Sequence, residues 1–189
     1  QTAPPVTVEQ ATIRPVVVIP GFFGTLWRNT SANGIPINDL VLDPLNNTYE
    51  GLLRQLRILG YEDQTTIAIF AYPWYTYTLE DLSDQLAEHI TTWWNGKTHP
   101  AYVHATEFDI VAHSTGGLIA RRYVDDYGAS RLHDVFFVAT PQQGAPMAFG
   151  ALEGLDPQTA IRPLANWFDR FIANTTDMVG RSLRSTHPY

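Results

Sequence analysis

Ser114 carries the strongest chemical signal in the sequence. It follows an apolar run at residues 108–113 and precedes a stretch of helical character at residues 115–120. A serine at a sharp strand-to-helix turn exposes its hydroxyl, and the N–H groups that open the helix point to where an oxyanion would form. The usual spacing is G-x-S-x-G, and Ala112 replaces the first glycine here with only one added methyl group. The pattern predicts a nucleophile elbow, and the alternative is an ordinary serine N-cap.

A second candidate element lies near the start of the chain. Residues 16–19 are four consecutive β-branched residues, which is the pattern of a fully buried strand. They lead into residues 20–25, where Gly21 and Gly24 would let the backbone approach a substrate closely. The alternative is an ordinary turn whose two phenylalanines pack on the core.

Strands and helices alternate between and after these two elements. Apolar spacing, a Thr78/Asp81 capping-box pattern and the stop residues Gly60 and Gly128 define the helices. The predicted order is strand 14–20, helix 48–59, strand 65–71, a helix opening after residue 78, the elbow strand, a helix to about residue 127, and strand 135–138. This alternation predicts an α/β fold with a parallel sheet and right-handed crossovers. We expect the strands to lie side by side in the order second, first, elbow, fourth.

Four segments resemble α/β-hydrolases of the lecithin:cholesterol acyltransferase-like (lipase/acyltransferase) family. They are VIPGFFG at residues 18–24, YPW at 72–74, AHSTGGLIAR at 112–121 and ATPQQGAP at 139–146. The resemblance spans residues 14–146 and implies the N-terminal part of a catalytic domain with the α/β-hydrolase fold. It also implies that Ser114 is the nucleophile and that Phe22 and Thr115 form the oxyanion hole through their main-chain N–H groups.

The resemblance implies a catalytic acid and then a histidine after the serine, both on loops that follow later strands. No strand is predicted after residue 146, and His187 is better explained as a surface residue. The triad acid and histidine therefore stay unassigned. We expect a sheet truncated after the strand that follows the nucleophile helix, with its edge covered by the missing C-terminal part of the same domain.

The expected organisation is one partial domain over residues 1–189. It comprises a lead-in at 1–13, a core at 14–146 and a helical lid or cap at 147–189. Residues 163–173 place several apolar side chains on one helical face, so this lid is expected to contact a lipid surface.

Composition excludes several other functions. The net charge of −7 and the lack of basic runs argue against nucleic acid as a partner. The chain has no cysteine, and its histidines and carboxylates show no ligand spacing, so no metal site is predicted. The glycine loop lacks the G-x-G-x-x-G dinucleotide pattern, so no cofactor is expected. The family resemblance, the absence of cysteine and the start at Gln1 favour a secreted or extracytoplasmic location.

The predicted function is that of a serine-dependent esterase or lipase acting on lipid or other carboxylic esters through an acyl-enzyme. Phe23, Trp27 and Trp74 are candidate contacts for an apolar acyl chain, although aromatic residues also serve as core. Two alternatives stay open. The same serine would serve an O-acyltransferase, and the unassigned acid and base also fit a non-catalytic α/β-hydrolase-like binding fragment.

Overall fold

The computed structural model describes residues 13–22, 24–32, 35–42, 47–74, 77–97 and 102–145, and within most of the stretch 26–41 it describes only the backbone. The expected lid or cap at residues 147–189 lies outside the described residues, as does almost all of the lead-in.

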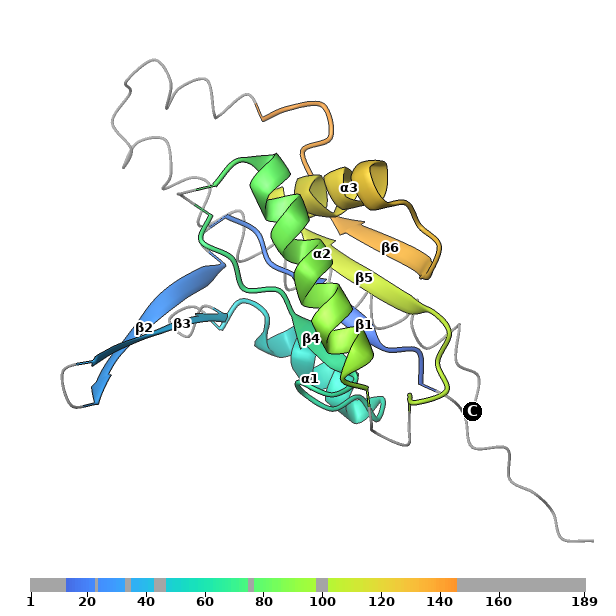
Figure 1. Cartoon of the computed structure of the whole chain (residues 1–189), viewed down its shortest axis with the longest axis horizontal. Helices are drawn as coiled ribbons and strands as arrows, with labels where there is room; N and C mark the ends of the chain where they lie inside the picture. The colour runs from blue at the N-terminus through green and yellow to red at the C-terminus, as the bar shows by residue number, and fades with distance from the viewer. Residues whose placement is uncertain are drawn as a thin grey trace, which may run out of the picture.

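A four-stranded parallel sheet forms the centre of the molecule (Figure 1). Its strands are β1 (Val16–Ile19), β4 (Ile67–Ile69), β5 (Phe108–His113) and β6 (Leu132–Val138). They are ordered β4-β1-β5-β6, which confirms the order predicted from the sequence. The bounds of three strands differ from the prediction, because β1 and β4 are shorter than expected and β6 begins three residues earlier.

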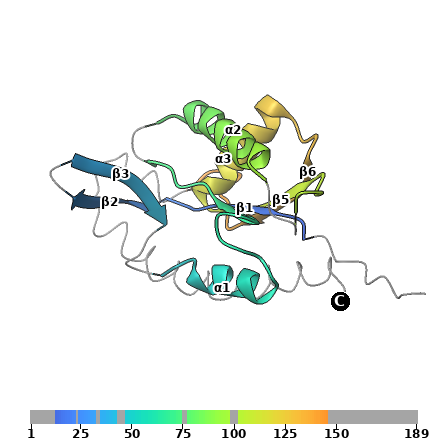
Figure 2. The same ribbon diagram turned by 60° about the horizontal axis from the view of Figure 1, so that its bottom comes forward.

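Helices cover both faces of this sheet (Figure 2). Helix α1 (Glu50–Ile58) lies on one face, while α2 (Leu79–Asn95) and α3 (Thr115–Tyr127) lie together on the other. Strand β1 serves both layers because successive side chains point to opposite faces. Val17 and Ile19 pack in the core beneath α2 and α3, whereas Val16 and Val18 pack with α1. The uninterrupted β-branched run therefore reflects burial on two sides.

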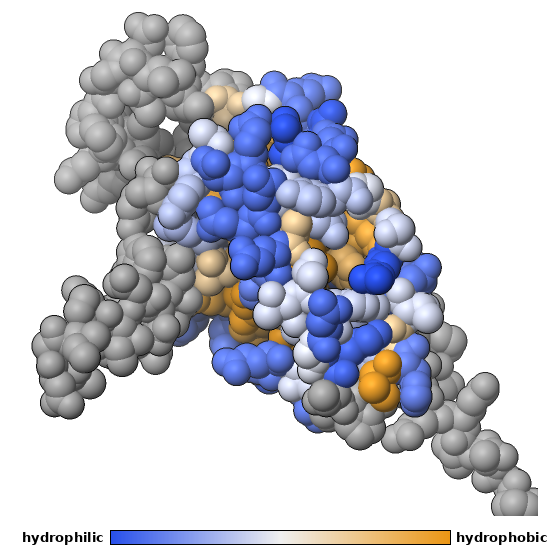
Figure 3. Space-filling view, viewed as in Figure 1, coloured by the Kyte–Doolittle hydropathy of each residue, from blue (hydrophilic) through white to orange (hydrophobic). Residues whose placement is uncertain are grey.

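The helix ends follow the signals in the sequence. Thr78 caps α2 with the predicted capping box, in which its side chain and that of Asp81 each accept from the other's backbone N–H. Helix α3 ends at Gly128, whose φ of +76° is accessible at little cost to glycine. The outer face of α2 is largely hydrophilic (Figure 3), as expected for an amphipathic helix on a sheet. None of the helices in the described ranges has the length and apolar character needed to cross a membrane.

A two-stranded antiparallel hairpin was not predicted. Strands β2 (Thr25–Ala32) and β3 (Ile35–Leu42) form it directly after the glycine loop, and it projects from the body of the molecule (Figure 1). Ala32 pairs with Ile35, so only two residues separate the strands. Their sequence is Asn-Gly, which is the strongest short signal for a hairpin turn.

Candidate active site

Ser114 occupies a strained turn between β5 and α3. Its backbone has φ 51° and ψ −122°, a region that residues other than glycine rarely adopt. Its N–H donates to the Val138 carbonyl at 2.8 Å, and its own carbonyl accepts from the Gly117 N–H at 3.0 Å. The neighbouring strand and the first turn of the helix thus hold the serine in this conformation, which is the one that a nucleophile elbow requires. We call this turn between β5 and α3 the elbow.

Close backbone contacts explain the small residues around the serine. A Cβ atom on Gly116 would overlap the Pro20 carbonyl oxygen and lie 2.6 Å from that of Ile19. A Cβ atom on Gly21 would lie 2.9 Å from the Ser114 Cβ atom. The glycine loop after β1 and the elbow after β5 are therefore in direct contact, as expected for adjacent parallel strands.

The glycine loop is held by hydrogen bonds to two buried tyrosines. The Tyr72 hydroxyl donates to the Pro20 carbonyl at 2.9 Å, and the Gly21 N–H donates to the Tyr49 hydroxyl at 2.7 Å. The Gly24 N–H closes a turn on the Gly21 carbonyl at 2.9 Å. Phe22 lies inside this turn, so the position of its backbone is set by contacts on either side.

His113 is buried beside the serine and supports the packing there. Its Nδ1 atom lies 2.8 Å from the Tyr49 hydroxyl, and the two rings meet edge to face. Burial lowers the pKa of His113 to about 4, so the ring is neutral near pH 7.

Aromatic side chains flank the glycine loop. Phe22 is 44% exposed and packs against Trp74 with ring centroids 4.3 Å apart. The Trp74 Nε1–H donates to the Thr25 carbonyl at 3.1 Å, which fixes the indole beside the loop. The structure thus brings together two of the aromatic residues singled out in the sequence.

The structure places the remaining predicted site residues in different detail. Thr115 is the first residue of α3, directly after Ser114. Phe23 lies outside the described residues, and Trp27 is placed in β2 opposite Leu40 by its backbone alone.

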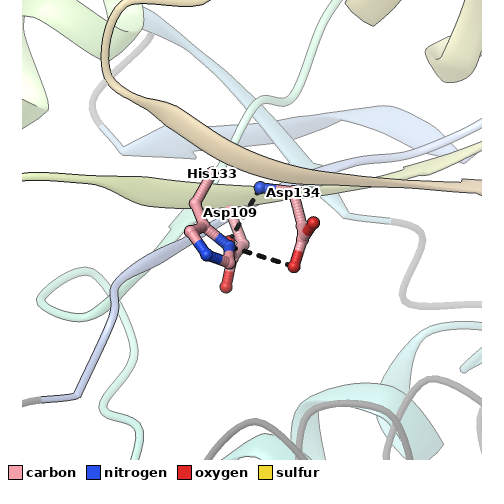
Figure 4. Close-up of side chains that lie close together, drawn as sticks. All are labelled: Asp109, His133 and Asp134. Atoms are coloured by element: carbon pink, nitrogen blue, oxygen red, sulfur yellow. Dashed lines mark hydrogen bonds and ion pairs between the residues drawn. The ribbon is translucent and has the colours of Figure 1, made fainter.

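No acid–histidine pair lies beside Ser114 in the part of the chain that the structure describes. The His133 Nδ1 atom does lie 3.0 Å from an Asp134 carboxylate oxygen and 3.5 Å from one of Asp109 (Figure 4). Asp109, however, is near the start of β5, five residues before the serine, or roughly 16 Å along an extended strand. These residues lie at the N-terminal ends of the strands, whereas Ser114 follows the C-terminal end of β5. The triad acid and histidine stay unassigned.

The group formed by Asp109, His133 and Asp134 has the atoms to hold a metal ion, with ligand atoms within 4.8 Å of one another. Sequence spacing did not reveal it, because its members come from neighbouring strands. Protein donors already occupy the buried Asp109 carboxylate: Arg14 reaches one oxygen at 3.3 Å, and the Asp134 N–H donates to the other at 3.1 Å. Burial raises the pKa of Asp109, and the charge of Arg14 opposes that shift. We interpret the group, together with Arg14, as a polar network built on the Arg14–Asp109 ion pair, which joins the beginnings of β1, β5 and β6.

Comparison with known proteins identifies the family. The model of the family described as "Alpha/beta hydrolase family" matches residues 16–188. The chain belongs to this family. Membership agrees with the observed α/β-hydrolase fold and supports a hydrolase-type function. None of the curated proteins compared with the chain matches it.

Two solved structures are similar to parts of the chain. Phospholipase PlaB from Legionella pneumophila, in complex with thio-NAD, is 19% identical with a TM-score of 0.47; the match covers 72% of this chain and 27% of that one. An extracellular alpha/beta-hydrolase from a Paenibacillus species, described as sharing structural and functional homology with Tobacco Salicylic Acid Binding Protein 2, is 14% identical with a TM-score of 0.43; the match covers 82% and 53%. The chain therefore spans between about a quarter and about half of these proteins.

Proposed function

We propose that the protein is a serine-dependent esterase or lipase that acts on lipid or other carboxylic esters. The observation that carries this proposal is the strained strand-to-helix position of Ser114 against the glycine loop. An alcohol side chain is a weak nucleophile, and such a turn presents it to substrate while helix N–H groups face the developing negative charge. Family membership favours the same chemistry over an ordinary N-cap.

The proposed ester hydrolysis proceeds in two steps, acylation of the serine and hydrolysis of the acyl-enzyme. The Ser114 Oγ atom forms an ester bond with the acyl carbon while the bond to the alcohol breaks, and the alcohol leaves with the serine proton. Water then cleaves the acyl-enzyme, which releases the carboxylic acid and restores the serine. In each step the tetrahedral oxyanion accepts from the N–H groups of Phe22 and Thr115.

The geometry around the loop supports these two donors. Phe22 directly follows Gly21, whose Cα lies against the elbow, and Thr115 opens α3, where the partial positive charge of the helix N-terminus favours an anion. Phe22 and Trp74 add a half-exposed aromatic surface beside the loop, which suits an apolar acyl chain.

The finer assignments remain proposals of the same kind. They are membership of the lecithin:cholesterol acyltransferase-like branch, substrate contacts from Phe23 and Trp27, a lipid-facing lid at residues 147–189, and secretion. The aromatic contacts and the lid would suit the proposed substrate class, since an enzyme acting on lipid needs an apolar approach to its site.

Hydrolysis of a p-nitrophenyl ester by the full-length protein tests the proposal. Ser114→Ala should lower turnover by about 10⁶-fold, the effect of removing the nucleophile from a serine triad. Ser130→Ala is the matched control, because Ser130 is exposed in the turn between α3 and β6, and it should keep wild-type activity. Ester hydrolysis by Ser114→Ala within tenfold of wild type would exclude the serine as nucleophile. Product analysis with added alcohol separates hydrolysis from acyl transfer.

A further inference from the structure

Tyr49 lies where the two halves of the proposed oxyanion hole meet. It precedes α1, on the face of the sheet opposite α2 and α3, and its side chain is 4% exposed. Its hydroxyl accepts the Gly21 N–H at 2.7 Å and lies 2.8 Å from the His113 Nδ1 atom. A phenol hydroxyl carries one proton and two acceptor lone pairs, so it can hold both partners at once.

Each partner is joined by a peptide bond to a residue of the proposed active site. Gly21 precedes Phe22, and His113 precedes Ser114. The loop also fits closely around the hydroxyl, because a Cβ atom on Gly24 would lie 3.0 Å from the Tyr49 oxygen. One oxygen atom therefore connects the glycine loop to the elbow, through short hydrogen bonds on both sides.

We propose that Tyr49 is a positioning residue for the oxyanion hole: its hydroxyl fixes the separation between the Phe22 N–H and the Ser114–Thr115 turn. This inference rests on the proposed function.

The inference predicts a specific change in kcat and KM when the Tyr49 hydroxyl is removed. Oxyanion donors act only if they are held where charge develops, and small displacements reduce the stabilisation of the transition state. A substrate in its ground state gains little from those donors, so loss of the hydroxyl should lower kcat while KM stays close to wild type. A purely structural role would instead lower stability and leave kcat per folded molecule unchanged.

The experiment compares Tyr49→Phe with Tyr61→Phe in the full-length protein. Both changes remove one hydroxyl from a buried tyrosine on the α1 side, but Tyr61 lies near Asp109 at the other edge of the sheet. The readouts are the rate of inactivation by a fluorophosphonate and the separate kcat and KM for a p-nitrophenyl ester. We expect Tyr49→Phe to slow both inactivation and turnover by about 10- to 100-fold, the range for a misplaced catalytic group. Tyr61→Phe should stay within twofold of wild type.

Each other outcome has a defined meaning. Folded Tyr49→Phe that reacts within threefold of wild type overturns the inference and leaves the proposed function intact. If Tyr49→Phe does not fold, His113→Leu breaks the same link from the other end and must give the same slowing. Failure of both variants to fold, with Tyr61→Phe folded, would make the hydroxyl a stability element and also overturn the inference. A wild-type protein that the probe does not label refutes the proposed function and the inference together.

Discussion

Ser114 has a backbone conformation that its own residue type disfavours, and its neighbours supply the contacts that hold it there. The Val138 carbonyl and the first turn of α3 fix its backbone, and the contact with Gly21 leaves no room for a larger loop residue. Strain of this kind persists only where the surroundings over-determine it, which is a common property of functional sites. The serine and its small neighbours could be predicted because they are contiguous in the sequence.

Two other contacts in the molecule could not be predicted at the scale of single residues. Tyr49 and His113 are 64 positions apart, and neither belongs to a motif that specifies the other. The contact between Asp109 and His133 depends on the register of two strands, which spacing alone does not set. Both contacts depend on how strands and helices are placed in three dimensions, so they become visible only in the structure.

The buried His113 makes the stability of the protein depend on pH. Burial lowers its pKa from 6.5 to about 4, so below pH 6.5 the unfolded chain binds a proton that the folded protein does not. Its contribution to stability is complete above pH 6.5 and is lost as the pH falls towards 4. By linkage the loss amounts to about 2 kcal/mol at pH 5.

Urea unfolding at pH 7.5 and pH 5.0 measures this effect. His89 is half-buried, and this partial burial lowers its pKa, so the wild type carries a background dependence of the same sign. The comparison is therefore with His113→Leu, which should lose about 2 kcal/mol less than wild type between the two pH values. An equal loss in both proteins would show that His113 does not titrate as described.

At the scale of elements, the elbow depends on how closely α3 approaches β1. Gly116 lies at this contact, and its Cα faces the carbonyl oxygens of Pro20 and Ile19. Helix propensity alone predicts that Gly116→Ala stabilises the protein by about 1 kcal/mol. The contact predicts the opposite, a destabilisation of about 1–3 kcal/mol from overpacking, together with slower reaction of the serine.

Gly96→Ala is the control for this prediction. Gly96 caps the C-terminus of α2 at φ −81°, and a Cβ atom there would lie 3.3 Å from the Thr92 carbonyl oxygen and 3.6 Å from that of Trp93, so the change should stay within about 0.5 kcal/mol. Thermal unfolding of both variants gives the comparison. A Gly116→Ala protein as stable as wild type would mean that helix and strand can separate without cost, which contradicts the close contact.

Element prediction succeeded where local signals agreed and failed where they conflicted. The capping box at Thr78 and the β-branched run of β1 each have one interpretation, and both elements were found. The β2–β3 hairpin was missed because its strands contain asparagine, aspartate and proline, which are depleted in strands, although an Asn-Gly pair separates them.

For the whole molecule, the order of the sheet follows from a few general constraints. Buried strands joined by helices favour a parallel sheet. Right-handed crossovers place helices on both faces here because the direction of strand addition reverses after β4. The resulting order brings the glycine loop of β1 and the elbow of β5 to the same edge. Side-chain networks between layers, such as that of Tyr49, are not fixed by these constraints.

The network at Arg14, Asp109 and His133 shows the same limit at the other edge of the sheet. Arg14 precedes β1, while Asp109 and His133 belong to β5 and β6. Without the arrangement of the strands, Asp109 and His133 could be mistaken for a catalytic acid–histidine pair. The distance of this pair from Ser114 excludes it from the proposed chemistry, so the fold decides against an assignment that composition alone permits.

Mass spectrometry of the full-length protein after reaction with a fluorophosphonate is the decisive measurement. An activated serine oxygen displaces fluoride from phosphorus, and the probe reports that reactivity whatever the natural ester is. We predict one adduct per molecule, on the peptide that contains Ser114, and none in Ser114→Ala or in the unfolded protein. An adduct on a different serine of the folded protein, or an unmodified Ser114 peptide after complete exposure to the probe, would contradict the proposal that Ser114 is the nucleophile.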